Sequence, residues 1–139
     1  MSLLEPQIAT ISFAADLARH GERPALVAAD GLVSYADLDR RVTELVHDLG
    51  PVRRLVAFEA VPKVESVAAY LAGLRAGHVV LPLAPGGGAA VDRLLEVYDP
   101  DVLITAGTDW AVGERRPASG HALHPELALL LSTSGSTAT

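Results

Sequence analysis

The sequence has 139 residues, of which 50% are hydrophobic and only 4% aromatic. A chain of this length buries roughly two thirds of its unfolded surface, which suits one compact domain with an aliphatic core. The net charge is −6 and the basic residues are scattered, so a nucleic-acid-binding surface is not expected. The sequence contains no cysteine, which excludes disulfides and thiolate metal sites. No signal peptide and no membrane span is recognisable, so we expect a cytoplasmic protein.

The N-terminal part predicts a short helix, a hairpin and a longer helix. Apolar residues near helical spacing predict a short helix from residue 11 to 20, and Gly21 is a typical helix exit. The apolar runs 25–29 and 32–35 are joined by an Asp-Gly pair, which is typical of a tight hairpin. Ser34, with Asp37 three residues later, resembles a capping box that begins a helix ending at Gly50.

Short apolar runs then alternate with helical patterns. We expect strands at 55–60, 78–83, 102–105 and 127–132, and helices at 64–76 and 91–98. This alternation predicts right-handed crossovers and a parallel sheet with helices on its faces. The fold class is therefore α/β, a Rossmann-like sheet flanked by helices with a small N-terminal hairpin. The polar stretch 106–125 predicts a long surface connection.

A loop rich in serine, threonine and glycine follows the last predicted strand. Open α/β sheets bind ligands at the carboxyl ends of their strands, which is where the segment STSGSTAT begins. Gly135 permits close approach of a backbone, and the hydroxyls of Thr133, Ser134, Ser136 and Thr137 are neutral donors for phosphate oxygens. The Walker pattern GxxxxGK[ST] is absent, and on composition alone a polar tail explains the segment equally well.

Three stretches, in the same order, resemble motifs of the adenylate-forming (AMP-dependent synthetase and ligase) superfamily. SYADLDRRVTELVHDL, residues 34–49, is similar to the family's early "TYAEL" helix, and LAGLRAGHVVLPLAP, residues 71–85, is similar to its "lkaGavyvPLdP" segment. LLLSTSGSTAT resembles the "YTSGSTGxPKG" phosphate loop, and residues 92–105 match the family's usual helix and strand. The likeness covers nearly the whole chain from about residue 13, and the ordered set is more specific than any single motif.

The resemblance implies a single partial domain, residues 1–139, that forms the N-terminal part of an AMP-binding domain and ends within the ATP phosphate loop. Thr133, Ser134, Gly135, Ser136 and Thr137 fall on the loop that holds the β- and γ-phosphates of MgATP in this family. Ala138 stands where the family usually has glycine, and the usual proline and lysine would follow Thr139. The family's catalytic and metal-binding residues also follow this loop. We therefore expect no catalytic or metal-binding residue in this chain, and no activity from the chain alone.

The family joins a carboxylic acid to ATP, which gives an acyl-adenylate and pyrophosphate, and Mg²⁺ stabilises the leaving group. The resemblance implies an acyl-CoA synthetase of fatty or aryl acid metabolism, with coenzyme A as acceptor. A carrier-protein-loading adenylation domain of a peptide synthetase is the nearest alternative. A non-catalytic α/β interaction module is an alternative of another class. An apolar face left uncovered in the partial domain predicts self-association, that is, a homo-oligomer.

Three weaker patterns have simpler structural explanations. His121 and His124 have a spacing that suits a metal site on a helix, but the glycine and prolines around them favour a loop. Gly86–Gly88 is expected to be a connecting loop, because no GxGxxG follows a first strand. Glu59 and Glu65 are expected to mark a strand end and a helix start rather than a pair of catalytic acids.

Overall fold

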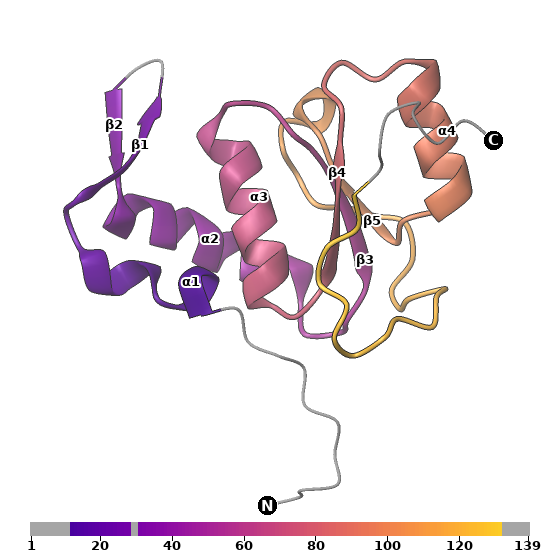
Figure 1. Ribbon diagram of the computed structural model, residues 1–139, viewed down its shortest axis with the longest axis horizontal. Helices are drawn as coiled ribbons and strands as arrows, with labels where there is room; N and C mark the ends of the chain where they lie inside the picture. The colour runs from indigo at the N-terminus through magenta and orange to yellow at the C-terminus, as the bar shows by residue number, and fades with distance from the viewer. Residues whose placement is uncertain (1–11, 29–30, 132–139) are drawn as a thin grey trace, which may run out of the picture.

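The computed structural model describes residues 12–28 and 31–131. Its centre is a four-stranded sheet with the strand order β4-β3-β5-β6 (Figure 1). The central strand β3 pairs in parallel with β4 on one side and with β5 on the other, and β6 adds an antiparallel edge to β5. The expected α/β fold with a parallel sheet is confirmed. The strand bounds are β3 Leu55–Glu59, β4 Val79–Leu83, β5 Val102–Ile104 and β6 Gly113–Glu114.

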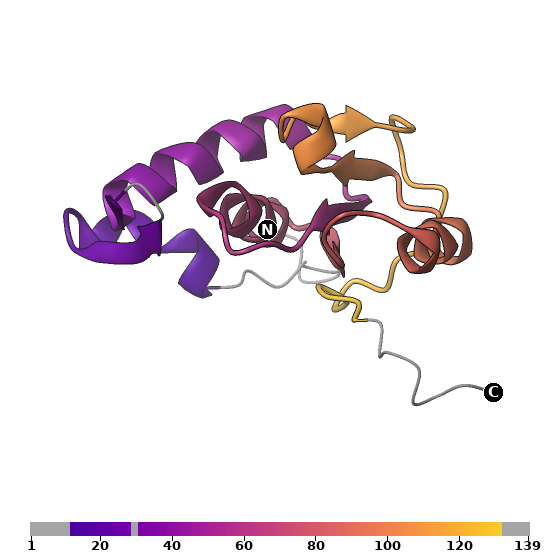
Figure 2. The same cartoon turned by 90° about the horizontal axis from the view of Figure 1, so that it is seen from above.

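Two helices cover opposite faces of this sheet. Helix α3, Val64–Arg75, connects β3 to β4, and helix α4, Ala89–Tyr98, connects β4 to β5 on the far side of β3. Right-handed crossovers in opposite directions place their helices on opposite faces, as Figure 2 shows. Alternate side chains of β3 accordingly join two separate cores: Val56 packs in the core on the α3 face, and Ala57 in the core on the α4 face.

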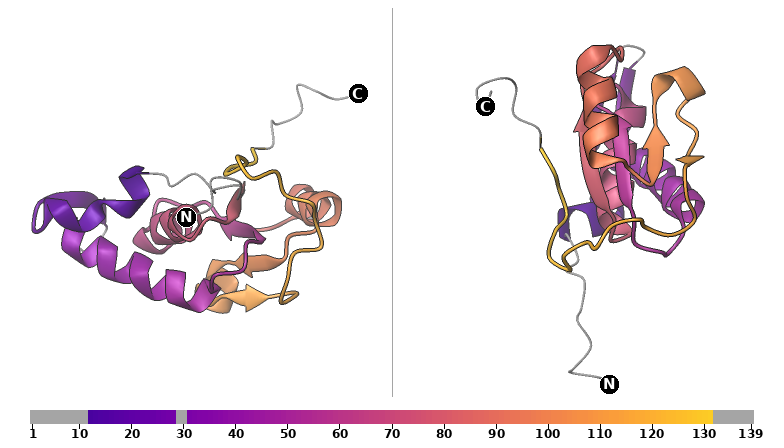
Figure 3. Two further views of the ribbon diagram at one scale, coloured as in Figure 1. Left: turned by 90° about the horizontal axis from the view of Figure 1, so that it is seen from below. Right: turned by 90° about the vertical axis from the view of Figure 1, so that its right-hand side faces the viewer.

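The N-terminal elements form a further layer against α3. They are α1 Ser12–Ala15, the 3₁₀ helix η1 Leu17–His20, the hairpin of β1 Pro24–Ala28 with β2 Gly31–Ser34, and α2 Tyr35–Leu49. The antiparallel hairpin is confirmed, although its turn residues 29–30 lie outside the described part of the chain. The predicted single helix over residues 11–20 is wrong in detail, because α1 and η1 are separated at Asp16. The left view of Figure 3 shows this layer at the opposite end of the molecule from α4.

Helix α2 begins and ends where its sequence predicts. The Ser34 hydroxyl accepts a hydrogen bond of 3.1 Å from the backbone N–H of Asp37, which satisfies one of the free donors of the first turn. Leu38, Val42 and Leu49 are buried on one face of the helix, which packs against α3. None of the described helices combines the length and the apolar character that crossing a membrane requires.

The polar connection after β5 is more structured than its composition predicts. It contains the short 3₁₀ helix η2, Ala106–Thr108, and the edge strand β6. The Ser119 hydroxyl and the Gly120 N–H also bond to the buried carboxylate of Asp101, at 2.7 and 3.0 Å. The prediction of a plain surface connection is therefore partly wrong, because polar residues that looked solvated satisfy a group inside the protein.

The last predicted strand is present only as a single bridge. Leu129 pairs in parallel with Val80 of β4, and the backbone of Val80 donates to Ala128 and accepts from Leu130, at 2.9 Å each. Residues 127–131 therefore occupy the next parallel position beyond β4. On their other side, no further strand of residues 12–28 or 31–131 pairs with them. Leu131 is 68% exposed.

Candidate nucleotide-binding edge of the sheet

The carboxyl ends of β3, β4 and β5 meet at one edge of the sheet. The loops that follow these strands surround a hollow of about 370 Å³ that is open to solvent. Carboxyl edges of parallel sheets are where α/β proteins bind their ligands. The hollow is lined by Glu59, Leu83, Ala84, Gly86, Gly87, Val91, Asp92, Leu95, Thr105, Ala106 and Gly107.

Glu59, at the end of the central strand β3, is one of the two acidic residues that line the hollow. Its Oε2 accepts a hydrogen bond from the Gly86 N–H, and its Oε1 accepts one from the Ala106 N–H, each at 2.9 Å. These two N–H groups, first that of Gly86 and then that of Ala106, lower the pKa of Glu59, and the charge of Lys63 adds to the effect. The carboxylate is therefore ionised near neutral pH.

Sequence reasoning placed Glu59 and Glu65 at a strand end and a helix start, and both placements are confirmed. It missed the role of Glu59 in joining two loops. The partners of Glu59 lie 27 and 47 residues further along the chain, so no local pattern announces them. Two features of the sequence could have indicated this role. Glu59 is an acidic residue at the end of a buried strand, and a run of three glycines follows the next strand.

The loop of Gly86–Gly88 connects β4 to α4, as expected. All three glycines have positive φ angles, 85°, 72° and 98°, in the left-handed region that disfavours other residues. The loop therefore has a conformation that depends on glycine, and it forms one wall of the hollow.

The five predicted phosphate-loop residues, Thr133, Ser134, Gly135, Ser136 and Thr137, lie outside the described residues. Their role stays a prediction. What the structure describes is the chain that leads to them. Because Leu129 pairs with Val80 in parallel, residues 129–131 run towards the same edge at which β3 and β4 end.

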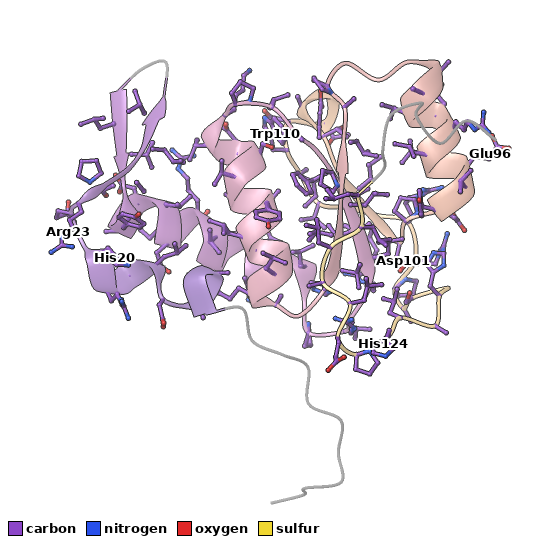
Figure 4. All side chains as sticks on the ribbon, viewed as in Figure 1. His20, Arg23, Glu96, Asp101, Trp110 and His124 are labelled. Carbon is purple, nitrogen blue, oxygen red and sulfur yellow. The ribbon has the colours of Figure 1, made fainter. Side chains whose placement is uncertain are left out.

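The opposite edge of the sheet holds a buried polar cluster. Asp101 is fully buried, and its two carboxylate oxygens accept four hydrogen bonds. Burial alone would raise the pKa of Asp101, but the N–H groups of Gly120 and Leu55 and the Ser119 hydroxyl outweigh it, so the pKa lies below its usual value. Figure 4 places Asp101 and His124 away from Trp110, which lies nearer the carboxyl edge. The saturated carboxylate is a structural group.

Arg54 and His78 extend this cluster. The Arg54 guanidinium is 4% exposed and donates to Glu114 at 2.6 Å and to the carbonyls of Leu49 and Arg116 at 2.7 and 2.9 Å. His78 Nδ1 accepts from the Arg54 N–H at 3.0 Å, so its proton is on Nε2, which faces the Gly50 carbonyl at 3.1 Å. Burial lowers the pKa of His78, and the ring is therefore neutral.

The two histidines of the HALH stretch lie in a loop, as expected. His121 Nε2 contacts the Asp99 carbonyl at 2.8 Å, and His124 Nδ1 accepts from the Glu126 N–H at 3.1 Å. Within residues 12–28 and 31–131, no group of three or more histidines and acids is placed to hold a metal ion.

Comparison with solved structures identifies the fold. The N-terminal subdomain of NpsA from Klebsiella oxytoca, in complex with 3-hydroxybenzoyl-AMSN, matches 99% of this chain with a TM-score of 0.68 and 20% identity. VinN in complex with L-aspartate matches 67% with a TM-score of 0.59 and 23% identity. The nonribosomal peptide synthetase FmoA3 matches 85% with a TM-score of 0.57 and 21% identity. No family model and no curated protein matches the sequence.

The chain spans 41% of the NpsA chain, 28% of the VinN chain and 12% of the FmoA3 chain. It thus corresponds to less than half the length of each. The match to NpsA nevertheless extends over almost every residue of this chain, including the hairpin and the sheet. The fold of this chain is therefore similar to that of the NpsA N-terminal subdomain, in agreement with the fold that the sequence motifs predicted.

Proposed function

We propose that the protein containing this chain is an ATP-dependent, AMP-forming carboxylic acid ligase, and that residues 1–139 are the N-terminal part of its AMP-binding domain. One observation carries the proposal. The segment STSGSTAT follows a strand position that runs in parallel with β4 towards the carboxyl edge, within a fold like that of NpsA. NpsA subdomains bind 3-hydroxybenzoyl-AMSN and 3-hydroxyanthranilyl-AMSN, which are adenylate analogues.

The proposed reaction begins when a carboxylate oxygen attacks the α-phosphorus of ATP. The new bond gives an acyl-adenylate, and the bond to the bridging oxygen of pyrophosphate breaks. In this proposal, the hydroxyls and amides of residues 133–137 hold the β- and γ-phosphates and so orient the leaving group. Neutral donors neutralise little of the charge that develops on pyrophosphate, which is why the reaction needs Mg²⁺.

The described residues do not fit a magnesium site. Mg²⁺ prefers carboxylate and phosphate oxygens, and each oxygen of Glu59 already accepts a hydrogen bond from a backbone N–H group. No group of three acids or histidines within residues 12–28 and 31–131 replaces it. The proposal therefore assigns the metal to the phosphates and to residues outside these ranges.

Two acceptors for the acyl group fit the proposal. One is coenzyme A, as in acyl-CoA synthetases of the fatty or aryl acid type. The other is the thiol of a carrier protein, which the similarity to the peptide synthetase FmoA3 favours equally. The ligands of the similar structures carry aryl groups or are an amino acid, so aryl acids and amino acids are the first substrates to test.

The test is exchange of labelled pyrophosphate into ATP by the full-length protein, with a panel of aryl, amino and fatty acids. Exchange that depends on one class of acid supports the proposal and identifies the substrate. Addition of coenzyme A or of a carrier protein then identifies the acceptor by thioester formation. No exchange with any acid would contradict the proposal and favour the non-catalytic module.

A further inference from the structure

A single side chain holds together the chain segments that follow three parallel strands. Glu59 ends the central strand β3. Its carboxylate bonds to Gly86 in the loop after β4 and to Ala106 at the start of η2 after β5. These loops are walls of the hollow at the carboxyl edge.

The glycine loop needs an anchor of this kind. Glycine has the largest conformational freedom of any residue, so fixing three in a row costs the most entropy. A Cβ atom added at Gly86, Gly87 or Gly88 would meet nothing within 4 Å among the described residues, so packing around these α-carbons does not hold the loop. The hydrogen bond from the Gly86 N–H to Glu59 ties the start of this loop to β3, while the Gly88 carbonyl at its end accepts from the Asp92 N–H of α4 at 2.9 Å.

This anchor lies close to the chain that enters the predicted phosphate loop. Glu59 is paired with Leu83 across β3 and β4, and Val80 is paired with Leu129. If this register continues, Leu131 lies beside Pro82, one residue before β4 ends at Leu83. Leu131 is two strand positions from β3, which corresponds to roughly 10 Å.

We propose that Glu59 is a positioning residue of the nucleotide site, which fixes the loop 86–88 as the wall that faces the triphosphate of ATP. This inference rests on the proposed ligase function and adds a residue to it. Glu59 acts through the backbone of Gly86 and Ala106 and does not itself contact the nucleotide.

The geometry explains why a carboxylate serves here. Two oxygens in one plane accept from two N–H groups that approach from different loops, and hydrogen bonds to an ionised acceptor are stronger than those to a neutral one. An amide in its place has one oxygen, and its NH₂ group would face the second N–H.

The experiment compares Glu59→Gln with wild type in the full-length protein. The readout is the dependence of pyrophosphate exchange on the MgATP concentration, measured with the best acid of the panel. We expect Glu59→Gln to raise the KM for MgATP by roughly threefold to tenfold with little change in kcat, because the loosened wall weakens nucleotide binding. A purely structural role would reduce the fraction of folded enzyme and lower kcat at an unchanged KM.

The matched control is Glu96→Gln, the same chemical change at an exposed residue that points outward from α4 (Figure 4). It should leave both constants at their wild-type values. A Glu59→Gln enzyme with the KM of this control would overturn the inference while the ligase function stands. Wild-type enzyme without exchange would remove the ligase function and, with it, the nucleotide role of Glu59.

A second measurement tests the anchor without activity. Amide hydrogen exchange of the 139-residue chain should be faster at Gly86 or at Ala106 in Glu59→Gln than in wild type or Glu96→Gln, because glutamine has one acceptor oxygen for these two N–H groups. Unchanged exchange at both amides would contradict the anchoring role.

Discussion

Replacing Asp101 by asparagine should cost this chain a large part of its stability. The Asp101 Oδ2 accepts from the Leu55 N–H at 2.8 Å and from the Ser119 hydroxyl at 2.7 Å, and Oδ1 accepts from the Gly120 N–H at 3.0 Å and from Arg116 Nη1 at 2.9 Å. An asparagine side chain has one acceptor oxygen, so two donors lose their partner inside the protein. Each donor left without a partner inside the protein costs roughly 1–3 kcal/mol.

The pH dependence gives a second, independent readout. The pKa of Asp101 is lower in the folded chain than in the unfolded one, so its contribution to stability is full above the unfolded pKa of about 3.9. That contribution is lost as the pH falls through the lower, folded-state pKa. The free energy of unfolding of the wild-type chain should therefore decrease more steeply below about pH 4 than that of Asp101→Asn.

Urea denaturation of the 139-residue chain between pH 3 and 7 measures both effects. Asp48→Asn, at an exposed position on α2, is the matched control and should change stability by less than about 0.5 kcal/mol. If Asp101→Asn unfolds the chain, Ser119→Ala, which removes one donor, should still fold and cost about 1 kcal/mol. The reasoning would be refuted if Asp101→Asn were as stable as the control and if its free energy of unfolding decreased below about pH 4 as steeply as that of the control.

Four further predictions concern the helices, the phosphate loop and the open edge. Ser34→Ala should lower the stability of the chain in urea by about 1 kcal/mol, since the Asp37 N–H loses its cap, and an unchanged midpoint would contradict this. Gly73→Ala should cost about 1–3 kcal/mol, because the new methyl group would collide with the Val80 side chain, and its thermal melting temperature should fall accordingly. The double variant Ser134→Ala, Thr137→Val should lower pyrophosphate exchange of the full-length enzyme by about tenfold or more, while Thr43→Val on the exposed side of α2 should not. Sedimentation of the 139-residue chain should show self-association, because Leu131 is 68% exposed on an edge with which no other strand of residues 12–28 and 31–131 pairs, and a monomer at high concentration would contradict it.

The parts of the fold that follow from local patterns were predictable from the sequence. The cap at Ser34, the apolar face of α2 and the alternation from β3 to β5 each depend on residues a few positions apart, and each is confirmed. The resemblance of the ordered segments then predicted a fold like that of the NpsA N-terminal subdomain.

The parts that depend on distant partners were not predictable. Asp101 bonds to Leu55, which is 46 residues away, and Glu59 bonds to Gly86 and Ala106, at separations of 27 and 47 residues. A buried carboxylate and an exposed one look alike in a sequence, because burial is decided by which loops fold over them. For the same reason, residues 113–121 looked like a solvated connection, although they supply an edge strand and the donors to Asp101.

The most direct test of the central claim is pyrophosphate exchange by the full-length protein with ATP, Mg²⁺ and the acid panel. The account predicts exchange that requires a carboxylic acid of one class and that falls when the loop of residues 133–137 is altered. Exchange that is absent with every acid, from a folded full-length protein, would contradict it.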